Sequence, residues 1–149
     1  MTYLTARRQI VVEWGHCDPA GIVFNSRYFQ YFDWSTWLLF EQALGVPTFK
    51  FSTEFDVTMP IVDVRARFLA PAKFGDVIEI VSTVSEFRRS SFDVQHRIEN
   101  EGRLAVTGQE TRVWTGHDPQ EPERLRAKPI PAEVIDRFRV SPGTVAAAP

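Results

Sequence analysis

The chain has 149 residues, of which 44% are hydrophobic and 24% are charged, and its formal net charge at pH 7 is −2. This length favours one domain with a substantial core, and the composition is that of an ordinary globular protein. Because the net charge is small, no overall basic field predicts binding to nucleic acid or to an anionic membrane. We expect residues 1–140 to form a single domain and residues 141–149 to be a disordered tail.

Cysteine usage and the start of the chain bear on the compartment. Cys17 is the only cysteine, so an intrachain disulfide is excluded and a reducing compartment is consistent. The first eight residues lack the apolar segment of a signal peptide. Together these observations predict a cytoplasmic protein.

The first predicted element is a strand over residues 9–14, whose apolar face would carry Ile10, Val12 and Trp14. Residues 13–24 form a loop, because Pro19 and two glycines disfavour both helix and strand. The loop carries one central carboxylate, that of Asp18.

A long helix is predicted over residues 25–44, which contain no glycine or proline and are followed by Gly45 and Pro47. Twenty residues correspond to roughly 30 Å of helix axis. Asn25 or Ser26 can cap its start. Aromatic and aliphatic side chains cover most of its circumference, so the helix is expected to be buried. It carries too many polar groups to span a bilayer.

The remaining pattern predicts four more strands, over residues 62–68, 77–86, 92–98 and 104–115. Residues 48–56, with three phenylalanines, are expected to be a loop packed on the core. Residues 131–138 are expected to form a short helix after a charged, proline-rich segment. Strands with one wet face and a helix too apolar to face water predict an α+β fold, in which a roughly five-stranded antiparallel sheet wraps around the central helix. Exposed sheet edges favour self-association.

The segment Gly15-His-Cys-Asp-Pro-Ala-Gly-Ile-Val23, followed by an aromatic helix, resembles the hot-dog-fold acyl-CoA thioesterases of the 4-hydroxybenzoyl-CoA type. Three further stretches, residues 59–62, 87–92 and 123–127, resemble the same family in the same order. The resemblance covers roughly residues 8–138. It implies a hot-dog fold, an acyl-CoA substrate and dimers that assemble into homotetramers with active sites at subunit interfaces.

The resemblance assigns Asp18 the carboxylate that attacks the thioester carbon or activates water. The alternative is an aspartate that only stabilises the loop. The backbone N–H groups of Phe24, Asn25 and Ser26 are candidate oxyanion donors, with Asn25 the donor by family position. Ordinary caps or water could also satisfy these groups.

Coenzyme A contacts are predicted for two stretches. The first contains the arginine pair Arg88 and Arg89 with Ser90, and the second contains Arg124 and Arg126. The alternative for the pair is a solvated hairpin corner. The predicted acyl pocket contains Phe24, Tyr28, Met59 and Pro60, and Trp34 is a further candidate. This chain departs from the family pattern at three positions. The family often has an acidic residue where this chain has His16, the nearest members have an aromatic residue where it has Asn25, and a lysine stands in the family where it has Ser90.

The other chemically active residues are assigned structural roles. His16 is expected to face solvent, although it could tune Asp18, and His96 is expected to be a hydrogen-bonded core histidine. Cys17 is interpreted as a small buried filler and Asp33 as structural. The histidine spacing predicts no metal site, and the resemblance predicts no cofactor apart from the coenzyme A of the substrate.

The prediction is therefore an acyl-CoA thioesterase, with an aromatic acyl group preferred over a short aliphatic one. A non-catalytic acyl-CoA-binding module on the same fold is the alternative from another class, since function resides in the site rather than in the fold. A dehydratase is disfavoured because no histidine lies in a dehydratase-type motif.

Overall fold

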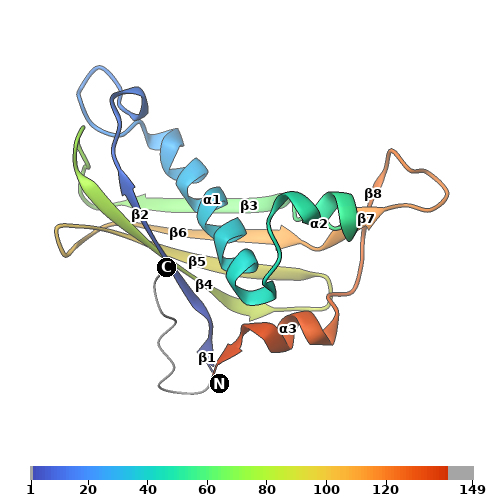
Figure 1. Ribbon diagram of the computed structural model, residues 1–149. Coiled ribbons are helices and arrows are strands. Elements are labelled where there is room, and N and C mark those ends of the chain that lie inside the picture. The colour runs from blue at the N-terminus through green and yellow to red at the C-terminus, as the bar shows by residue number, and fades with distance from the viewer. Residues whose placement is uncertain (1, 141–149) are drawn as a thin grey trace.

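The computed structural model describes residues 2–140; the expected tail, 141–149, lies outside the described residues. The central element is a five-stranded antiparallel sheet in the order β2-β4-β5-β6-β3. Its strands are β2 (Thr5–Val11), β3 (Ile61–Phe68), β4 (Val77–Phe87), β5 (Ser91–Asn100) and β6 (Arg103–Val113). Helix α1 (Asn25–Leu44) crosses one face of this sheet (Figure 1). The expected α+β hot-dog fold is thus confirmed.

Shorter elements close the two ends of the helix. They are β1 (Thr2–Tyr3), the 3-10 turn η1 (Trp14–His16), α2 (Phe49–Glu54), β7 (Thr115–His117), β8 (Leu125–Ala127), α3 (Ala132–Phe138) and β9 (Arg139–Val140). β1 pairs with β9, and β7 pairs with β8. The β7–β8 hairpin extends beyond the sheet at the end where α2 and α3 lie (Figure 1).

Helix α1 has the bounds expected from the sequence, and Gly45 ends it in the left-handed conformation with φ of 68°. The side chains of Phe32, Leu39 and Phe40 are fully buried against the sheet. Close packing depends on Gly108 of β6, because a Cβ there would lie 2.4 Å from the ring of Phe32. The helix therefore rests directly on the backbone of β6.

Three local expectations are wrong. The first strand ends at Val11, because the chain turns at η1 and leaves Trp14 71% exposed. Residues 49–54 are helical rather than a loop, since no glycine or proline interrupts them, and only Phe51 is buried. The α1 N-cap is Phe24, so neither Asn25 nor Ser26 caps the helix. The proline-rich segment, to which the sequence assigned no element, contains the β7–β8 hairpin.

Strand β3 also differs from the expected strand with one buried and one solvent-exposed face, because all of its large apolar residues are exposed. It is an edge strand, and Ile61, Val62, Val64 and Phe68 are 38–61% exposed. The other edge strand, β2, carries Arg7 and Gln9 on its exposed positions, with Val11 as its only exposed large apolar residue. A long apolar edge favours pairing with another strand.

Candidate active site

The loop around Asp18 is a tight turn tied to the rest of the fold. Gly21 N–H donates to Asp18 O at 2.9 Å, with Pro19 inside the turn and Gly21 at φ of 77°. Ala20 N–H donates to Asp18 Oδ1 at 2.8 Å. Val23 N–H donates to Ala72 O at 2.8 Å, which anchors the loop just before β4. One carboxylate oxygen of Asp18 is thus held by the backbone, and Oδ2 has no donor among residues 2–140.

The start of α1 supplies backbone donors beside this carboxylate. Phe24 N–H is already bonded to His16 O at 2.9 Å, so it is not available as an oxyanion donor. The N-cap side chain is a phenyl ring and makes no capping hydrogen bond. The first-turn N–H groups of Asn25 and Ser26 therefore keep no cap within the described chain, at the positive end of a 20-residue helix.

Asp18, Asn25 and Tyr28 line one surface cavity of about 310 Å³, whose other walls are Ile22, Val23 and residues 68–71. Tyr28 is 4% exposed, and its burial raises the pKa of its phenol. The ring of Tyr28 lies 5.5 Å from that of Phe68, the last residue of β3. The structure thus brings together a carboxylate, uncapped backbone donors and an aromatic wall.

The remaining predicted pocket residues lie elsewhere in this chain. Phe24 is 48% exposed and does not line the cavity. Met59 is buried and Pro60 exposed, and both precede β3, whereas the Asp18 cavity lies at the end of β3. Eight residues of strand correspond to roughly 26 Å. Within one chain these two residues are therefore far from Asp18.

Comparison with known proteins agrees with this geometry. The family model of the thioesterase-like superfamily matches residues 12–138. The chain belongs to this superfamily. Over 133 residues it is 33% identical to 4-hydroxybenzoyl-CoA thioesterase of Pseudomonas sp. strain CBS-3, covering 84% of this chain and 91% of the relative.

Solved structures of the thioesterase family share the whole fold. A crystal structure of an aspartate-to-asparagine variant of 4-hydroxybenzoyl-CoA thioesterase, complexed with 4-hydroxybenzoyl-CoA, is similar with a TM-score of 0.82 and 30% identity, over 91% of this chain and 99% of that one. A gentisyl-coenzyme A thioesterase is similar with a TM-score of 0.76 and 31% identity, over 87% and 99% of the two chains.

The predicted coenzyme A residues lie at the opposite end of this thioesterase-family fold from Asp18. β4 is 11 residues long, or about 35 Å. The Asp18 loop is anchored just before its start, and Arg88 and Arg89 follow its end (Figure 1). Arg89 O accepts from Ile130 N–H at 2.8 Å, which places the pair beside the return of the chain from β8.

The two arginines of the pair differ in their surroundings. The guanidinium of Arg88 donates to Asp93 through both Nη atoms, at 3.1 and 2.6 Å, and also to Glu86 and Ser91. The hydrogen bond from Arg88 lowers the pKa of Asp93, and that bond in turn raises the pKa of Arg88. The side chain of Arg89 is exposed and has no partner among residues 2–140. Arg88 is therefore neutralised within the chain, and Arg89 is available to a ligand.

The weaker candidates are all near this end. Ser90 O accepts from Trp114 N–H at 2.8 Å, so this residue fixes the hairpin through its backbone. Arg124 lies 3.6 Å from Glu121 in an exposed ion pair, and Arg126 of β8 is exposed.

His16 has a different position from the one expected. Its Nδ1 lies 2.9 Å from the hydroxyl of Tyr31 and 3.3 Å from the backbone nitrogen of Glu13. It is half-buried against α1 rather than turned to solvent. Burial raises the pKa of Tyr31 to about 12. His16 thus braces the loop against the helix. Cys17 is half-buried and packs against the core edge, which is less than the full burial expected.

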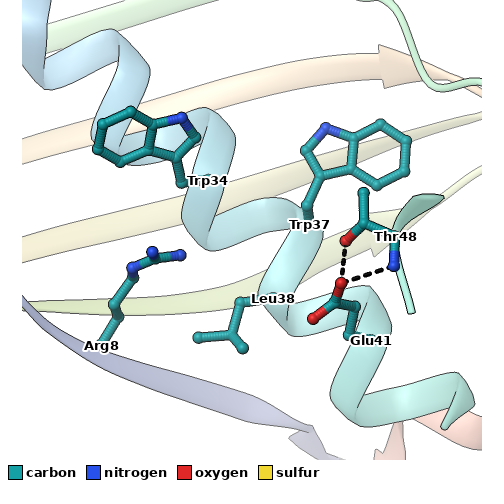
Figure 2. Close-up of a pocket in the computed structure, with 6 residues that line it drawn as sticks. All are labelled: Arg8, Trp34, Trp37, Leu38, Glu41 and Thr48. Carbon is teal, nitrogen blue, oxygen red and sulfur yellow. Dashed lines mark hydrogen bonds between the residues drawn. The ribbon is translucent and has the colours of Figure 1, made fainter. Parts of the chain in front are cut away.

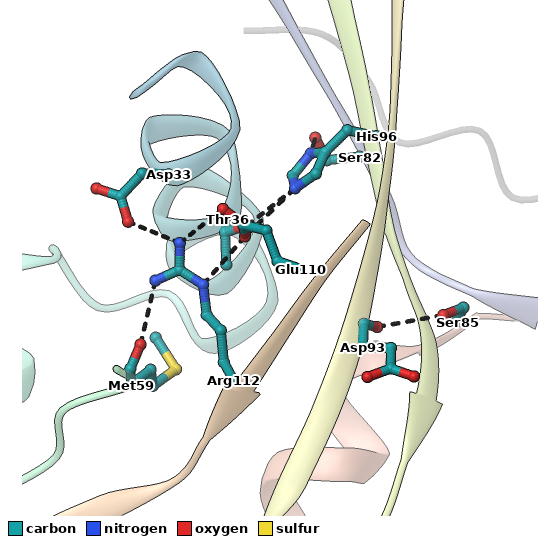
Figure 3. A network of polar contacts seen from close by, with 9 residues as sticks. All are labelled: Asp33, Thr36, Met59, Ser82, Ser85, Asp93, His96, Glu110 and Arg112. Carbon is teal, nitrogen blue, oxygen red and sulfur yellow. Dashed lines mark hydrogen bonds and ion pairs between the residues drawn. The ribbon is translucent and has the colours of Figure 1, made fainter. Parts of the chain in front are cut away.

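A buried polar network joins α1 to the sheet, and sequence reasoning missed its central residues (Figure 3). Arg112 is 1% exposed and donates to both oxygens of Glu110 at 3.0 Å, to Asp33 Oδ1 at 2.6 Å and to Met59 O at 3.1 Å. Glu110 accepts from Thr36 at 2.6 Å. The sequence predicts a strand over residues 104–115 but gives no sign of the partners of these two charged residues, because those partners lie on α1 and just before β3.

The expected roles of His96 and Asp33 agree with this network. His96 is 1% exposed, lies 2.7 Å from Ser82 Oγ and 3.3 Å from Glu110, and stacks on Phe32 at 4.6 Å. It is a hydrogen-bonded core histidine. No group of three or more potential metal ligands occurs among residues 2–140, and no helix in that range is long and apolar enough to cross a membrane.

Proposed function

We propose that this chain is an acyl-CoA thioesterase that hydrolyses an acyl-CoA to a carboxylic acid and free coenzyme A, with an aromatic acyl group. The observation that carries the proposal is the pairing of Asp18 with Asn25, whose backbone N–H has no cap, at one cavity. The aromatic acyl group is supported by relatives that are 4-hydroxybenzoyl-CoA and gentisyl-coenzyme A thioesterases.

In the proposed reaction, the free Oδ2 of Asp18 either attacks the thioester carbon or takes a proton from an attacking water. The C–S bond breaks and coenzyme A leaves as a thiolate, a good leaving group. On the direct-attack route the acyl group is then held by Asp18 as an anhydride, which water hydrolyses to the acid and the free carboxylate; on the water route the acid forms directly. Negative charge that develops on the carbonyl oxygen is stabilised by the Asn25 N–H and the helix dipole. The Ala20 N–H holds the other oxygen of Asp18 in place at 2.8 Å.

The complete site is proposed to need two chains. If two β3 strands pair antiparallel about a two-fold axis, the start of one lies beside the end of the other. Met59 and Pro60 of the partner subunit would then approach the Asp18 cavity, whose wall includes Phe68. The exposure of the apolar residues of β3 in a single chain supports this arrangement, which would bury them. It also agrees with the separation of Arg89 from Asp18 within one chain.

The deciding experiment measures thiol release from a panel of benzoyl-, 4-hydroxybenzoyl-, phenylacetyl-, acetyl- and butyryl-CoA. We expect fast turnover of one aromatic substrate and a fall of about 10²- to 10⁴-fold in kcat for Asp18→Asn, with thermal melting unchanged. Asp136→Asn, an exposed carboxylate on α3, is the matched control. Preference for butyryl-CoA would replace the aromatic assignment by the aliphatic one. Binding of the substrates without thiol release would replace the enzyme by a binding module.

A further inference from the structure

A cleft on the outer side of α1 is lined by residues that the proposed reaction does not use. It has a volume of about 360 Å³ and is lined by Arg8 of β2, by Trp34, Trp37, Leu38 and Glu41 of α1, and by Thr48 (Figure 2). This volume lies in the range of small-molecule sites. The Asp18 cavity shares none of these residues. Trp34, a sequence candidate for the acyl pocket, belongs to this second cleft.

Arg8 is a half-buried cation without an anionic partner in the described chain. Its guanidinium lies 5.8 Å from the centre of the Trp34 ring, and no carboxylate or carbonyl of residues 2–140 accepts from it. A guanidinium over an aromatic face keeps its N–H edge free for bidentate hydrogen bonds to a carboxylate. The neighbouring Arg7 differs, because it points to the other face of the sheet and pairs with Glu79 at 2.6 Å.

The hydrogen-bonding groups of the cleft favour an anion. The indole N–H groups of Trp34 and Trp37 donate to no protein group within residues 2–140, so they add two free donors. The single carboxylate in the lining, that of Glu41, is engaged through Oε1 by the N–H of Thr48 at 2.6 Å and by the Thr48 hydroxyl. Free donors therefore line the cleft, while Oε1 of its one carboxylate is already bonded and only Oε2 accepts from no group of residues 2–140.

The geometry points to a binding site for a small planar aromatic carboxylate in this cleft. The carboxylate would accept from Arg8, and the ring would pack on the two indoles and Leu38. The acid released in the proposed reaction belongs to the same chemical class, and only this link to product binding rests on the proposed function. The site itself is independent of that function.

The test uses benzoate as the probe and 15N-labelled full-length protein, with the indole N–H signals as reporters. We expect saturable shifts of the Trp34 and Trp37 signals and none at Trp114, which is 5% exposed and packs on the buried ring of Phe40 rather than in the cleft. Arg8→Gln should weaken this binding at least about tenfold, because one charge-assisted bidentate contact contributes that much. Arg8→Lys should weaken it less, and Arg7→Gln should leave it unchanged.

Readouts other than turnover separate this proposal from the thioesterase assignment. Arg8→Gln is expected to leave thiol release unchanged, and inactivity of the wild type would leave the benzoate titration interpretable. Trp34→Phe, which keeps a ring but loses the donor, gives a second variant if Arg8→Gln is unstable. Unchanged benzoate affinity in Arg8→Gln would overturn the proposal. So would indole signals that respond to protein concentration and not to benzoate, since a second copy would then cover the cleft.

Discussion

Arg112 Nη2 donates a hydrogen bond of 2.6 Å to Asp33 Oδ1, and this contact joins the end of β6 to the middle of α1. Arg112 is also bonded to Glu110 and to the carbonyl of Met59, so one guanidinium fixes the helix, the sheet and the entry to β3 (Figure 3). The relative position of α1 and the edge strand thus depends on a buried charge.

Arg112→Met should lower the free energy of unfolding by about 3–5 kcal/mol, because it leaves the Glu110 carboxylate buried without its cation. The double variant Glu110→Gln/Arg112→Met should recover part of this loss, since it also removes the uncompensated charge. Urea unfolding measures both values. Arg97→Met, which removes an exposed pair with Glu99, is the control and should cost less than ~1 kcal/mol. A double variant no more stable than the single one would contradict this account.

The loss of unfolding free energy at low pH should depend on the same buried network around Glu110 and Arg112. Burial alone would raise the pKa of Glu110, but hydrogen bonds from His96 and Arg112 outweigh it and lower the pKa to about 2. Because the folded pKa lies below the ordinary value of 4.5, the stabilisation is complete above about pH 4.5 and is lost as the pH falls toward 2. Its size is about 3 kcal/mol.

The measurement is the unfolding free energy of the wild type and of Glu110→Gln between pH 7 and pH 2. The wild-type curve should fall more steeply below pH 4.5, so the difference between the two proteins should shrink with acidification. Other carboxylates with lowered pKa, such as Asp93, are common to both proteins and cancel. A difference that stays constant with pH would exclude Glu110 as the source.

Local sequence signals were sufficient where neighbouring residues decide the structure. The bounds of α1 follow from an uninterrupted run that ends at Gly45, and the turn at Asp18 follows from Pro19 and Gly21. The resemblance at this loop gave Asp18 as the candidate carboxylate, and the structure places it in one cavity with Asn25 and Tyr28.

Predictions that depend on distant residues were less successful. Alternation in β3 correctly indicated a strand. Whether Val64 is exposed depends on whether another strand or another chain pairs with this edge of the sheet, and the alternation pattern of β3 does not contain this information. Nothing in the sequence distinguishes Arg88 from Arg89 as a ligand contact. Only the fold shows that Asp93 on the next strand neutralises Arg88 and leaves Arg89 free.

Coenzyme A binding should distinguish these two arginines. Arg89→Ala should raise KM for an acyl-CoA about tenfold with little change in kcat, because it removes a phosphate contact and not a reacting group. Arg88→Ala should have a smaller effect on KM and mainly loosen the β4–β5 hairpin. The effect of Arg89→Ala should vanish with an acyl-pantetheine thioester, which lacks the nucleotide phosphates. Equal KM effects of both variants would contradict the assignment.

The edge strand should control assembly and activity together. Val64 lies in the middle of β3 and is 38% exposed, so Val64→Asp places a charge in the proposed seam between two chains. We expect this variant to shift the protein toward monomer in light scattering and to lose thiol release in parallel, because each site is proposed to need both chains. Val77→Asp is the matched control, because Val77 is also an exposed valine but lies on β4, away from this edge. It should affect neither property. A Val64→Asp monomer with full activity would show that one chain contains the complete site, and an unchanged oligomer would place the interface elsewhere.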